Sequence, residues 1–193
     1  MTSSSSAAAL LVIDAQESFR HRADEWAATA NPAVLDNIAL LVAHAREAGD
    51  PVFWITHSDP GSGGVFDPAS GLVRVIDELG PRESEAALGK TTINAFASTD
   101  LHERLQAEGV GRVVICGIRT EQCCETTARA AADLGYDVEF VTDATTTSAI
   151  PAAEGLSAVS GEDILRRTES ILAARGFATI VRTRELVGLA AQS

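Results

Sequence analysis

The chain has 193 residues, with 15 lysines and arginines against 27 aspartates and glutamates, which gives a formal net charge of −12. Hydrophobic residues make up 46% of the sequence and charged residues 22%, which is typical of a folded domain and not of a disordered chain. The acidic balance argues against nucleic acid as a partner, because phosphate binding needs clustered lysine and arginine. The longest apolar run, residues 7–13, is too short to span a membrane.

The three cysteines, Cys116, Cys123 and Cys124, indicate a reducing compartment. They are too few for a disulfide framework, two of them are adjacent, and no Cys-x-x-Cys occurs. Without a second cluster of cysteine or histidine we expect no structural zinc and no cofactor. The first six residues lack the basic residues of a secretory signal. The sequence therefore predicts a cytoplasmic protein, with residues 1–7 as a disordered tail and residues 8–193 as a single domain acting on a small molecule.

Short apolar segments alternate with longer helical patterns along the chain. In order, the patterns predict a strand at 8–13, a helix at 31–48, a strand at 51–56, a loop at 59–64, helical turns at 72–79, a loop at 88–96, a helix at 99–108, a strand at 112–116, a tight turn at 117–120, a helix at 121–134, a strand at 137–141, a loop at 142–148, a helix at 164–175 and a strand at 178–181. This alternation predicts a three-layer α/β/α fold with a mainly parallel central sheet, in which ligands bind beyond the carboxyl ends of the strands.

Three polar residues fall where such a sheet places a site. Asp14 closes the first predicted strand, Lys90 lies in the predicted loop at 88–96, and Cys123 follows the third strand. A thiol near a helix start and beside a lysine is expected to have a lowered pKa. A carboxylate within reach could accept the thiol proton and return it to a leaving amine, and a tight turn offers N–H groups for an oxyanion. Together these residues predict nucleophilic hydrolysis.

Each residue also has an ordinary structural interpretation. An aspartate at the end of a strand often only caps a turn, and a single loop lysine is usually solvated. Cys116 lies inside an apolar strand and is expected in the core. Because a helix turns about 100° per residue, Cys123 and Cys124 face different ways, and local chemistry alone does not decide which of them faces a site.

Three motifs resemble those of the isochorismatase-like cysteine hydrolases, the group that includes the nicotinamidases and related small-amide hydrolases. The segment Leu-Val-Ile-Asp-Ala-Gln at residues 11–16 resembles the strand-final aspartate of this family, which is followed two residues later by glutamine. Lys90 followed by Asn-Ala-Phe at residues 94–96 resembles a Lys-x-x-x-Ser-Ala-Phe block, with asparagine in place of serine. The segment at 117–129, Gly-Ile-Arg-Thr-Glu-Gln-Cys-Cys-Glu-Thr-Thr-Ala-Arg, resembles Gly-x-x-Thr-x-x-Cys-Val-x-x-Thr-Ala. The likeness extends over about residues 8–182.

The resemblance implies a role for each candidate. Cys123 aligns with the family nucleophile, Asp14 with the general base and acid, and Lys90 with the residue that stabilises the thiolate. A non-proline cis peptide would fall between Ile118 and Arg119, and the N–H groups of Arg119 and Cys123 would form the oxyanion hole. The resemblance also implies a homo-oligomer, a dimer or larger.

Five residues are predicted to line the pocket for a small amide substrate: Phe19, Trp26, Phe66, Ile118 and Arg119. Phe19 matches a family position that packs against the substrate, and the other aromatics are candidates for the same apolar wall. Trp54 is a further candidate, although its place in a predicted strand favours the core. The guanidinium of Arg119 could bind a substrate carboxylate or pair with Glu121, and these alternatives stay open.

The segment around His57 departs from the nicotinamidase pattern. Nicotinamidases carry Asp-x-His with further histidines that bind a metal, whereas this chain reads Thr-His-Ser-Asp at residues 56–59. We therefore predict no metal, interpret His57 as a residue of a loop or of the pocket edge, and do not expect nicotinamide as the substrate.

The resemblance and the local chemistry together predict an amidohydrolase that cleaves a small carboxamide through a thioester on Cys123. One alternative is isochorismatase-type hydrolysis of a vinyl ether, for which the family members known to do it lack the cysteine. The other alternative is a binding or sensor domain that uses a reactive thiol without turnover.

Overall fold

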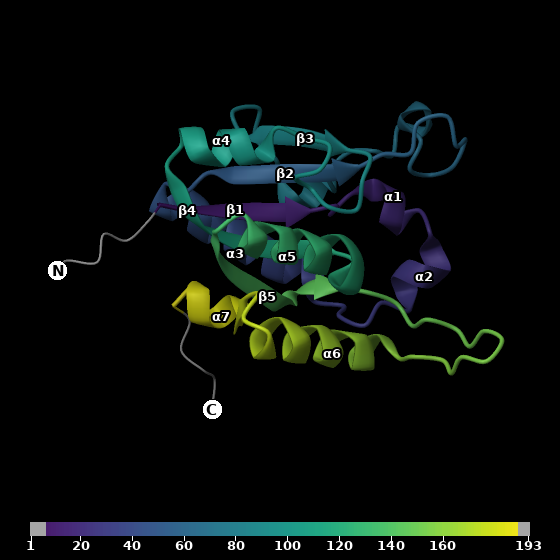
Figure 1. The fold of residues 1–193 in the computed structure, drawn as a ribbon. Helices are drawn as coiled ribbons and strands as arrows, with labels where there is room; N and C mark the ends of the chain where they lie inside the picture. Colours follow the sequence, from purple (N-terminus) through teal and green to yellow (C-terminus); the bar gives the residue numbers. More distant parts are fainter. Residues whose placement is uncertain (1–6, 189–193) are drawn as a thin grey trace.

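The computed structural model describes residues 7–188 (Figure 1). Of the tail expected at residues 1–7, residues 1–6 lie outside the described part, as do residues 189–193 at the other end. Ala7 is the first residue of strand β1.

Six parallel strands form one central sheet, which confirms the predicted parallel sheet but adds one strand, β3, to the five that the pattern predicted. Its order is β3-β2-β1-β4-β5-β6, and every neighbouring pair is parallel. The strands are β1 (Ala7–Ile13), β2 (Val52–His57), β3 (Ala86–Lys90), β4 (Val110–Ile118), β5 (Asp137–Thr146) and β6 (Thr179–Val181). The chain winds outward from β1 in both directions, so that the carboxyl ends of β1 and β4 lie side by side where the strand order reverses, and such a point is where sheets of this kind bind ligands.

Helices cover both faces of the sheet (Figure 1). One face packs against α3 (Val34–Ala48) and α7 (Thr183–Leu186), and the other packs against α4 (Leu101–Ala107), α5 (Glu125–Asp133) and α6 (Gly161–Ala174). Two short helices, α1 (Glu17–Arg20) and α2 (Ala23–Ala27), follow the carboxyl end of β1. None of the helices within residues 7–188 has the length and apolar character that crossing a membrane requires.

The side chains of β1 divide between the two layers because successive residues of a strand point to opposite faces. Leu11 and Ile13 join the core beneath α4 and α5, whereas Leu10 and Val12 join the core beneath α3. All four are at most 3% exposed. A strand that is covered on both faces must be apolar throughout, which explains the continuous apolar run in the sequence.

Several predicted boundaries were wrong. Lys90 is not in a loop but is the last residue of β3, where it pairs in register with His57 of β2. The Thr-rich segment predicted as a loop at 142–148 continues β5 as far as Thr146, because Thr145 and Thr146 pair with the extended end of β4. The β-branched threonine side chain suits such a strand.

The helical patterns also needed correction. The helix predicted from residue 121 begins as one π-helical turn, Thr120–Cys124, before α5. The turns predicted at 72–79 shrink to a 3₁₀ turn at Asp77–Leu79, because Val75 forms an antiparallel bridge with Gln16 instead. The short helices α1, α2 and α7 were not predicted, since each is too short to show a helical period.

Candidate active site

Three elements bring Asp14, Lys90 and Cys123 together at the carboxyl edge of the sheet. Asp14 follows β1, Lys90 ends β3, and Cys123 lies in the π-helical turn after β4. The Nζ atom of Lys90 lies 2.8 Å from Oδ2 of Asp14 and donates a hydrogen bond to Sγ of Cys123 at 3.3 Å. The structure therefore places one buried ammonium between a carboxylate and a thiol, in the grouping that the sequence predicted.

Asp14 is a buried carboxylate with unused hydrogen-bonding capacity. Its side chain is 0% exposed, and among the described residues neither carboxylate oxygen accepts a well-oriented hydrogen bond, although Oδ2 is paired by charge with Lys90. Burial raises the pKa of Asp14, and the charge of Lys90 only partly opposes this. The backbone of Asp14 has φ of 50°, a conformation that few residues other than glycine adopt. A base with a raised pKa and free lone pairs is suited to accept a proton.

The thiol of Cys123 differs from the expectation. Burial, followed by the nearby charge of Asp14, raises its pKa to about 12, and Lys90 offsets only part of that rise. The sequence predicted a lowered pKa because it revealed the helix start and the lysine but not the degree of burial. The raised pKa favours the neutral thiol of Cys123 over the thiolate.

The other two cysteines are packing residues, as predicted for Cys116. Cys116 and Cys124 are both 0% exposed, and Cys124 lies in the core formed with α4 and α5. Burial raises the pKa of each thiol far above its ordinary value. Of the three, Cys123 is the one that lines the pocket described below.

The side chain of Lys90 is fully buried, and its ammonium group contacts residues of the site. Besides Asp14 and Cys123, its Nζ donates to the backbone oxygen of Thr92 at 3.1 Å and lies 3.4 Å from Nδ1 of His57. A buried ammonium needs such a shell of acceptors, because leaving water without partners is very unfavourable. Burial and then the charge of Lys90 lower the pKa of His57, which favours the neutral imidazole.

The turn that carries Cys123 depends on a close approach between β1 and β4. Gly117 has φ of 127°, and a Cβ atom there would lie 1.9 Å from the carbonyl oxygen of Ile13. Only glycine fits this position. The peptide bond between Ile118 and Arg119 is cis, as expected. The turn closes when N–H of Cys124 donates to the carbonyl of Arg119 at 3.1 Å.

Gln16 ties the end of β1 to the end of β2. Its Oε1 accepts from N–H of His57 at 2.7 Å, and its Nε2 donates to the carbonyl of His57 at 3.0 Å and to Ser18 Oγ at 2.9 Å. Gln16 itself has no exposed surface. Gln16 therefore fixes the distance between the end of β1, which Asp14 follows, and the end of β2, where His57 lies.

A pocket of about 190 Å³ opens onto Asp14 and Cys123. Phe19 and Phe66 form part of its wall as an edge-to-face pair with ring centroids 5.0 Å apart. The remaining lining comes from Arg22, His57, Asp59, Ile93, Arg119 and Gln122. The pocket combines apolar walls with a few polar groups, which is the usual character of a small-molecule site.

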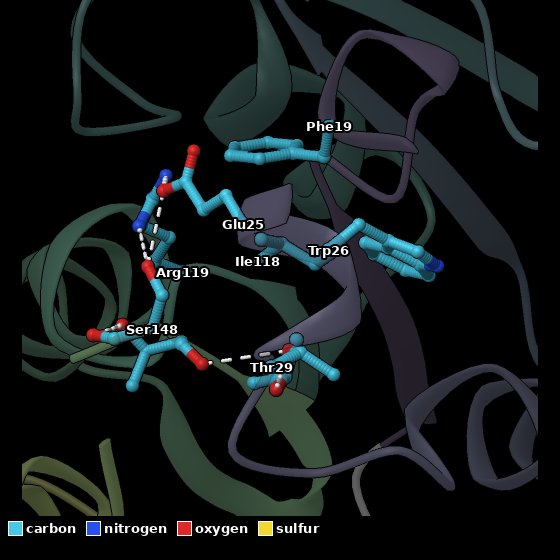
Figure 2. A pocket seen from close by; sticks show the side chains of 9 residues that line it. Phe19, Glu25, Trp26, Thr29, Ile118, Arg119 and Ser148 are labelled. Carbon is cyan, nitrogen blue, oxygen red and sulfur yellow. Dashed lines mark hydrogen bonds and ion pairs between the residues drawn. The ribbon is translucent and has the colours of Figure 1, made fainter. Parts of the chain in front are cut away.

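Figure 2 shows a smaller hollow of about 20 Å³. Phe19 and Arg119 line both this hollow and the pocket. Trp26 and Ile118 line the hollow and not the pocket that contains Asp14 and Cys123. Trp54 is a core residue, 2% exposed, whose Nε1 donates to Glu85 at 2.7 Å.

Arg119 has partners that the sequence did not reveal. Its guanidinium pairs with Glu25 of α2 and donates to Oγ of Ser148 at 2.5 Å, while Ser148 Oγ itself donates to Glu25 at 3.0 Å (Figure 2). The expected alternative partner, Glu121, forms no ion pair among the described residues. Glu25 is 94 positions and Ser148 is 29 positions from Arg119 in the sequence. No local sequence pattern could therefore identify them as its partners.

The comparisons with known proteins agree on one family. A sequence model of the Isochorismatase domain matches residues 8–156. The chain belongs to the isochorismatase family. The isochorismatase family protein YddQ of Bacillus subtilis (strain 168) is 35% identical over 143 residues, which cover 74% of this chain and 79% of YddQ. Nicotinamidase 3 of Arabidopsis thaliana is 36% identical over 156 residues, covering 72% of this chain and 73% of that protein. A crystal structure of a cysteine hydrolase from Pseudomonas syringae pv. phaseolicola matches with a TM-score of 0.86 at 26% identity, covering 94% of this chain and 91% of that one.

The pocket of this isochorismatase-family chain contains residues that the sequence did not single out. Arg22, Ile93 and Gln122 line it, and Ile93 is 42% exposed although it is a large apolar residue. The sequence signal for Ile93 is a large apolar residue within the predicted loop at 88–96, ahead of α4. Among residues 7–188, no group of three or more histidine, cysteine, aspartate or glutamate side chains is arranged to hold a metal ion. His57 lies at the pocket wall. The pocket edge was one of the two positions that the sequence predicted for it.

Proposed function

We propose that this chain is an amidohydrolase that cleaves a small carboxamide through a thioester on Cys123. The observation that carries the proposal is the position of Lys90 Nζ, 2.8 Å from the Asp14 carboxylate and 3.3 Å from the Cys123 sulfur, at the wall of a pocket of about 190 Å³. The similarity to a nicotinamidase, whose name denotes amide hydrolysis, supports the same reaction class.

The first half of the reaction forms the thioester. As the Cys123 sulfur attacks the amide carbon, its proton passes to Asp14, whose pKa is raised by burial and which has free lone pairs for it. Lys90 offsets the negative charge that moves between sulfur and carboxylate. The carbonyl oxygen becomes an oxyanion, and the backbone N–H groups of Arg119 and Cys123 are its proposed donors. Asp14 then gives the proton to the nitrogen, and ammonia or an amine leaves.

The second half returns the protein to its starting state. Water attacks the thioester carbon while Asp14 accepts one of its protons, and the carbon–sulfur bond breaks to release a carboxylic acid. Asp14 returns the proton to the Cys123 sulfur. A high pKa of the resting thiol fits this sequence, because the thiol carries its own proton into the first step and regains it in the last. The chemistry needs Cys123 reduced, which suits the cytoplasm.

The two other functions receive less support. A thiol that senses oxidants is usually exposed and has a lowered pKa, whereas Cys123 is 5% exposed and its pKa is raised. Vinyl-ether hydrolysis does not use a thiol nucleophile in this family, and it would leave the contact between Lys90 and Cys123 without a function.

Ammonia release from a panel of small primary amides and ureides tests the proposal. Cys123→Ala should abolish turnover, whereas Cys124→Ala, at the buried neighbouring position, should retain most of it. Rapid acid quenching followed by mass spectrometry should find an acyl adduct on the peptide that contains Cys123. Equal loss in the two variants, or turnover without any adduct, would remove Cys123 as the nucleophile.

A further inference from the structure

Arg119 lines both the pocket and the hollow and belongs to an ion-paired bridge whose other two members, Glu25 and Ser148, line the hollow. Arg119 lies between Glu25 on α2 and Ser148 after β5, and Figure 2 shows its guanidinium turned toward both. The carboxylate of Glu25 also accepts from Ser148 at 3.0 Å, so the three side chains hold one another. The guanidinium carbon of Arg119 lies 5.5 Å from the centre of the Phe19 ring, whose face it covers.

The hollow that these residues line is small, and most of its accessible surface is apolar. Its volume of about 20 Å³ accommodates roughly one water-sized group. Trp26, Ile118 and Phe19 supply apolar surface, and the hydroxyl groups of Thr29 and Thr146 lie 2.6 Å apart and hydrogen-bond each other. Because those hydroxyls already have partners, the hollow suits an alkyl group better than a polar one.

We propose that Arg119 is a specificity-determining residue, whose bridged side chain closes the inner end of the pocket and limits the acyl group of the substrate to short chains. This inference rests on the proposed amide hydrolysis and adds a substrate class to it, namely amides of short-chain acids. Arg119 side-chain atoms act here as a barrier, separately from the backbone N–H group of the same residue.

The position of Asp14 decides which part of the substrate meets the barrier. The leaving amine must lie beside Asp14, since this carboxylic acid gives it a proton. Asp14 lines the main pocket but not the hollow. The substituent that extends toward Ile118 and Arg119 is therefore the acyl chain.

The partners of Arg119 favour a barrier over a receptor for a substrate carboxylate. Its guanidinium already pairs with one carboxylate and one hydroxyl, and its side chain is 16% exposed. Arg22 also pairs with Glu25, at 3.4 Å, but it is 44% exposed and lines only the main pocket. A second anion would have to displace Glu25 from Arg119 at the expense of an existing charge-assisted bond.

The test compares Arg119→Ala with the wild-type protein on straight-chain primary amides from propionamide to octanamide. The wild type should lose kcat/KM as the chain lengthens. Arg119→Ala should shift the optimum to longer chains and raise the ratio of octanamide to propionamide at least about tenfold, because each methylene admitted to an apolar pocket contributes at about that scale. For the long amides, Arg119→Ala should act mainly by lowering KM. An unchanged chain-length profile would overturn the inference.

Arg20→Ala is the control, because it removes an ion-paired arginine, bound to Glu78 at 2.7 Å, that lines neither the pocket nor the hollow. Its chain-length profile should follow that of the wild type. Monoamides of dicarboxylic acids test the competing role. If Arg119→Ala loses activity on these acids while its profile on alkyl amides stays the same, Arg119 binds a carboxylate and the barrier interpretation is wrong.

A second measurement does not depend on turnover. The Cys123 thiol adds to a straight-chain aldehyde by forming one carbon–sulfur bond, with the thiol proton ending on the aldehyde oxygen, and this reversible adduct protects the sulfur from iodoacetamide. Intact mass measures how much Cys123 is alkylated by iodoacetamide in the presence of each aldehyde. The longest aldehyde that still protects Cys123 should be shorter for the wild type than for Arg119→Ala. Identical cut-offs would overturn the barrier even if no amide is hydrolysed, whereas shifted cut-offs without ammonia release would leave the barrier standing and reject the proposed reaction. Should Arg119→Ala fail to fold, Glu25→Ala/Arg119→Ala removes both charges of the pair and serves in its place.

Discussion

Strand β3 has an ion pair at each end, and the two pairs differ in almost every property. Glu85, which precedes the strand, accepts from Arg46 Nε at 2.7 Å, from Trp54 Nε1 at 2.7 Å and from the backbone N–H of Arg82 at 3.0 Å. Asp14, which meets Lys90 at the other end, has charge pairing but no well-oriented hydrogen bond among the described residues. The Glu85 carboxylate is therefore fully hydrogen-bonded, whereas the Asp14 carboxylate keeps lone pairs that can accept a proton.

The pKa values follow from this difference. Burial alone would raise the pKa of Glu85, but the hydrogen bonds from Arg46, Arg82 and Trp54 outweigh it and lower the pKa from 4.5 to about 2. At Asp14 burial outweighs Lys90, and the pKa is raised. A carboxylate that is fully hydrogen-bonded stabilises the fold and resists protonation. A buried carboxylate left short of donors destabilises the fold and accepts protons, which is what catalysis needs.

The largest expected effect separates the two carboxylates by activity. Asp14→Asn should lower kcat/KM for amide hydrolysis by about 10²–10⁴-fold, because the amide side chain fills the same space but cannot accept the thiol proton. Glu85→Gln, at the opposite end of β3, should leave kcat/KM near the wild-type value. Ammonia release under identical conditions measures both. A similar loss in the two variants would mean that Asp14 acts only through folding.

The second expected effect concerns stability. Lys90→Met leaves Asp14 as an uncompensated buried charge and should lower the free energy of unfolding by about 3–5 kcal/mol at pH 8. The loss should be smaller at pH 5, because an acid with a raised pKa is stabilising when protonated, and that stability is lost as pH rises. Urea unfolding at both pH values measures it.

A double variant provides the control for this prediction. Asp14→Asn/Lys90→Met removes both charges and should recover most of the lost stability, since replacing a buried pair by neutral groups is often close to neutral. If the double variant is as unstable as Lys90→Met alone, the loss comes from the packing of the lysine side chain and not from the orphaned charge.

The smallest expected effect concerns the satisfied carboxylate. Glu85→Gln should lower the free energy of unfolding by about 1–2 kcal/mol at pH 7, since the folded state favours the ionised form. A lowered pKa gives stability that is present above the unfolded-state value of 4.5 and is lost as pH falls toward 2. The difference between variant and wild type should therefore shrink as pH falls below 4.5, in thermal unfolding measured across that range. A constant difference would assign the loss to packing instead.

The sequence predicted β1 and β4, the strands that precede Asp14 and Cys123, because burial on both faces leaves an unbroken apolar run, as in residues 8–13. It also predicted the grouping of Asp14, Lys90 and Cys123, because the family motifs fix their order along the chain. Lys90 was nevertheless assigned to a loop. Edge strand β3 is only partly buried, and Gly89 next to Lys90 weakens its strand pattern, so its identity depends on pairing with β2.

The electrostatic properties of the site could be predicted only from the folded structure. The pKa of Cys123 depends on how completely water is excluded, and a lysine in the sequence gives no measure of that. The partners of Arg119 come from α2 and from the chain after β5, and α2 itself was not predicted. Local patterns thus predict which residue types meet at a sheet edge, whereas the charge balance among them depends on packing between distant segments.

Gly117 illustrates how such a site responds to random mutation. The close approach of this residue to the Ile13 carbonyl positions the strand ends next to Asp14 and Cys123, the proposed acid and nucleophile, yet Gly117 takes no part in the proposed chemistry. A mutant library screened only for activity would therefore score Gly117 and Cys123 as equally intolerant positions. Parallel scoring of cellular abundance would separate them, because loss at Gly117 removes the folded protein and loss at Cys123 leaves it intact.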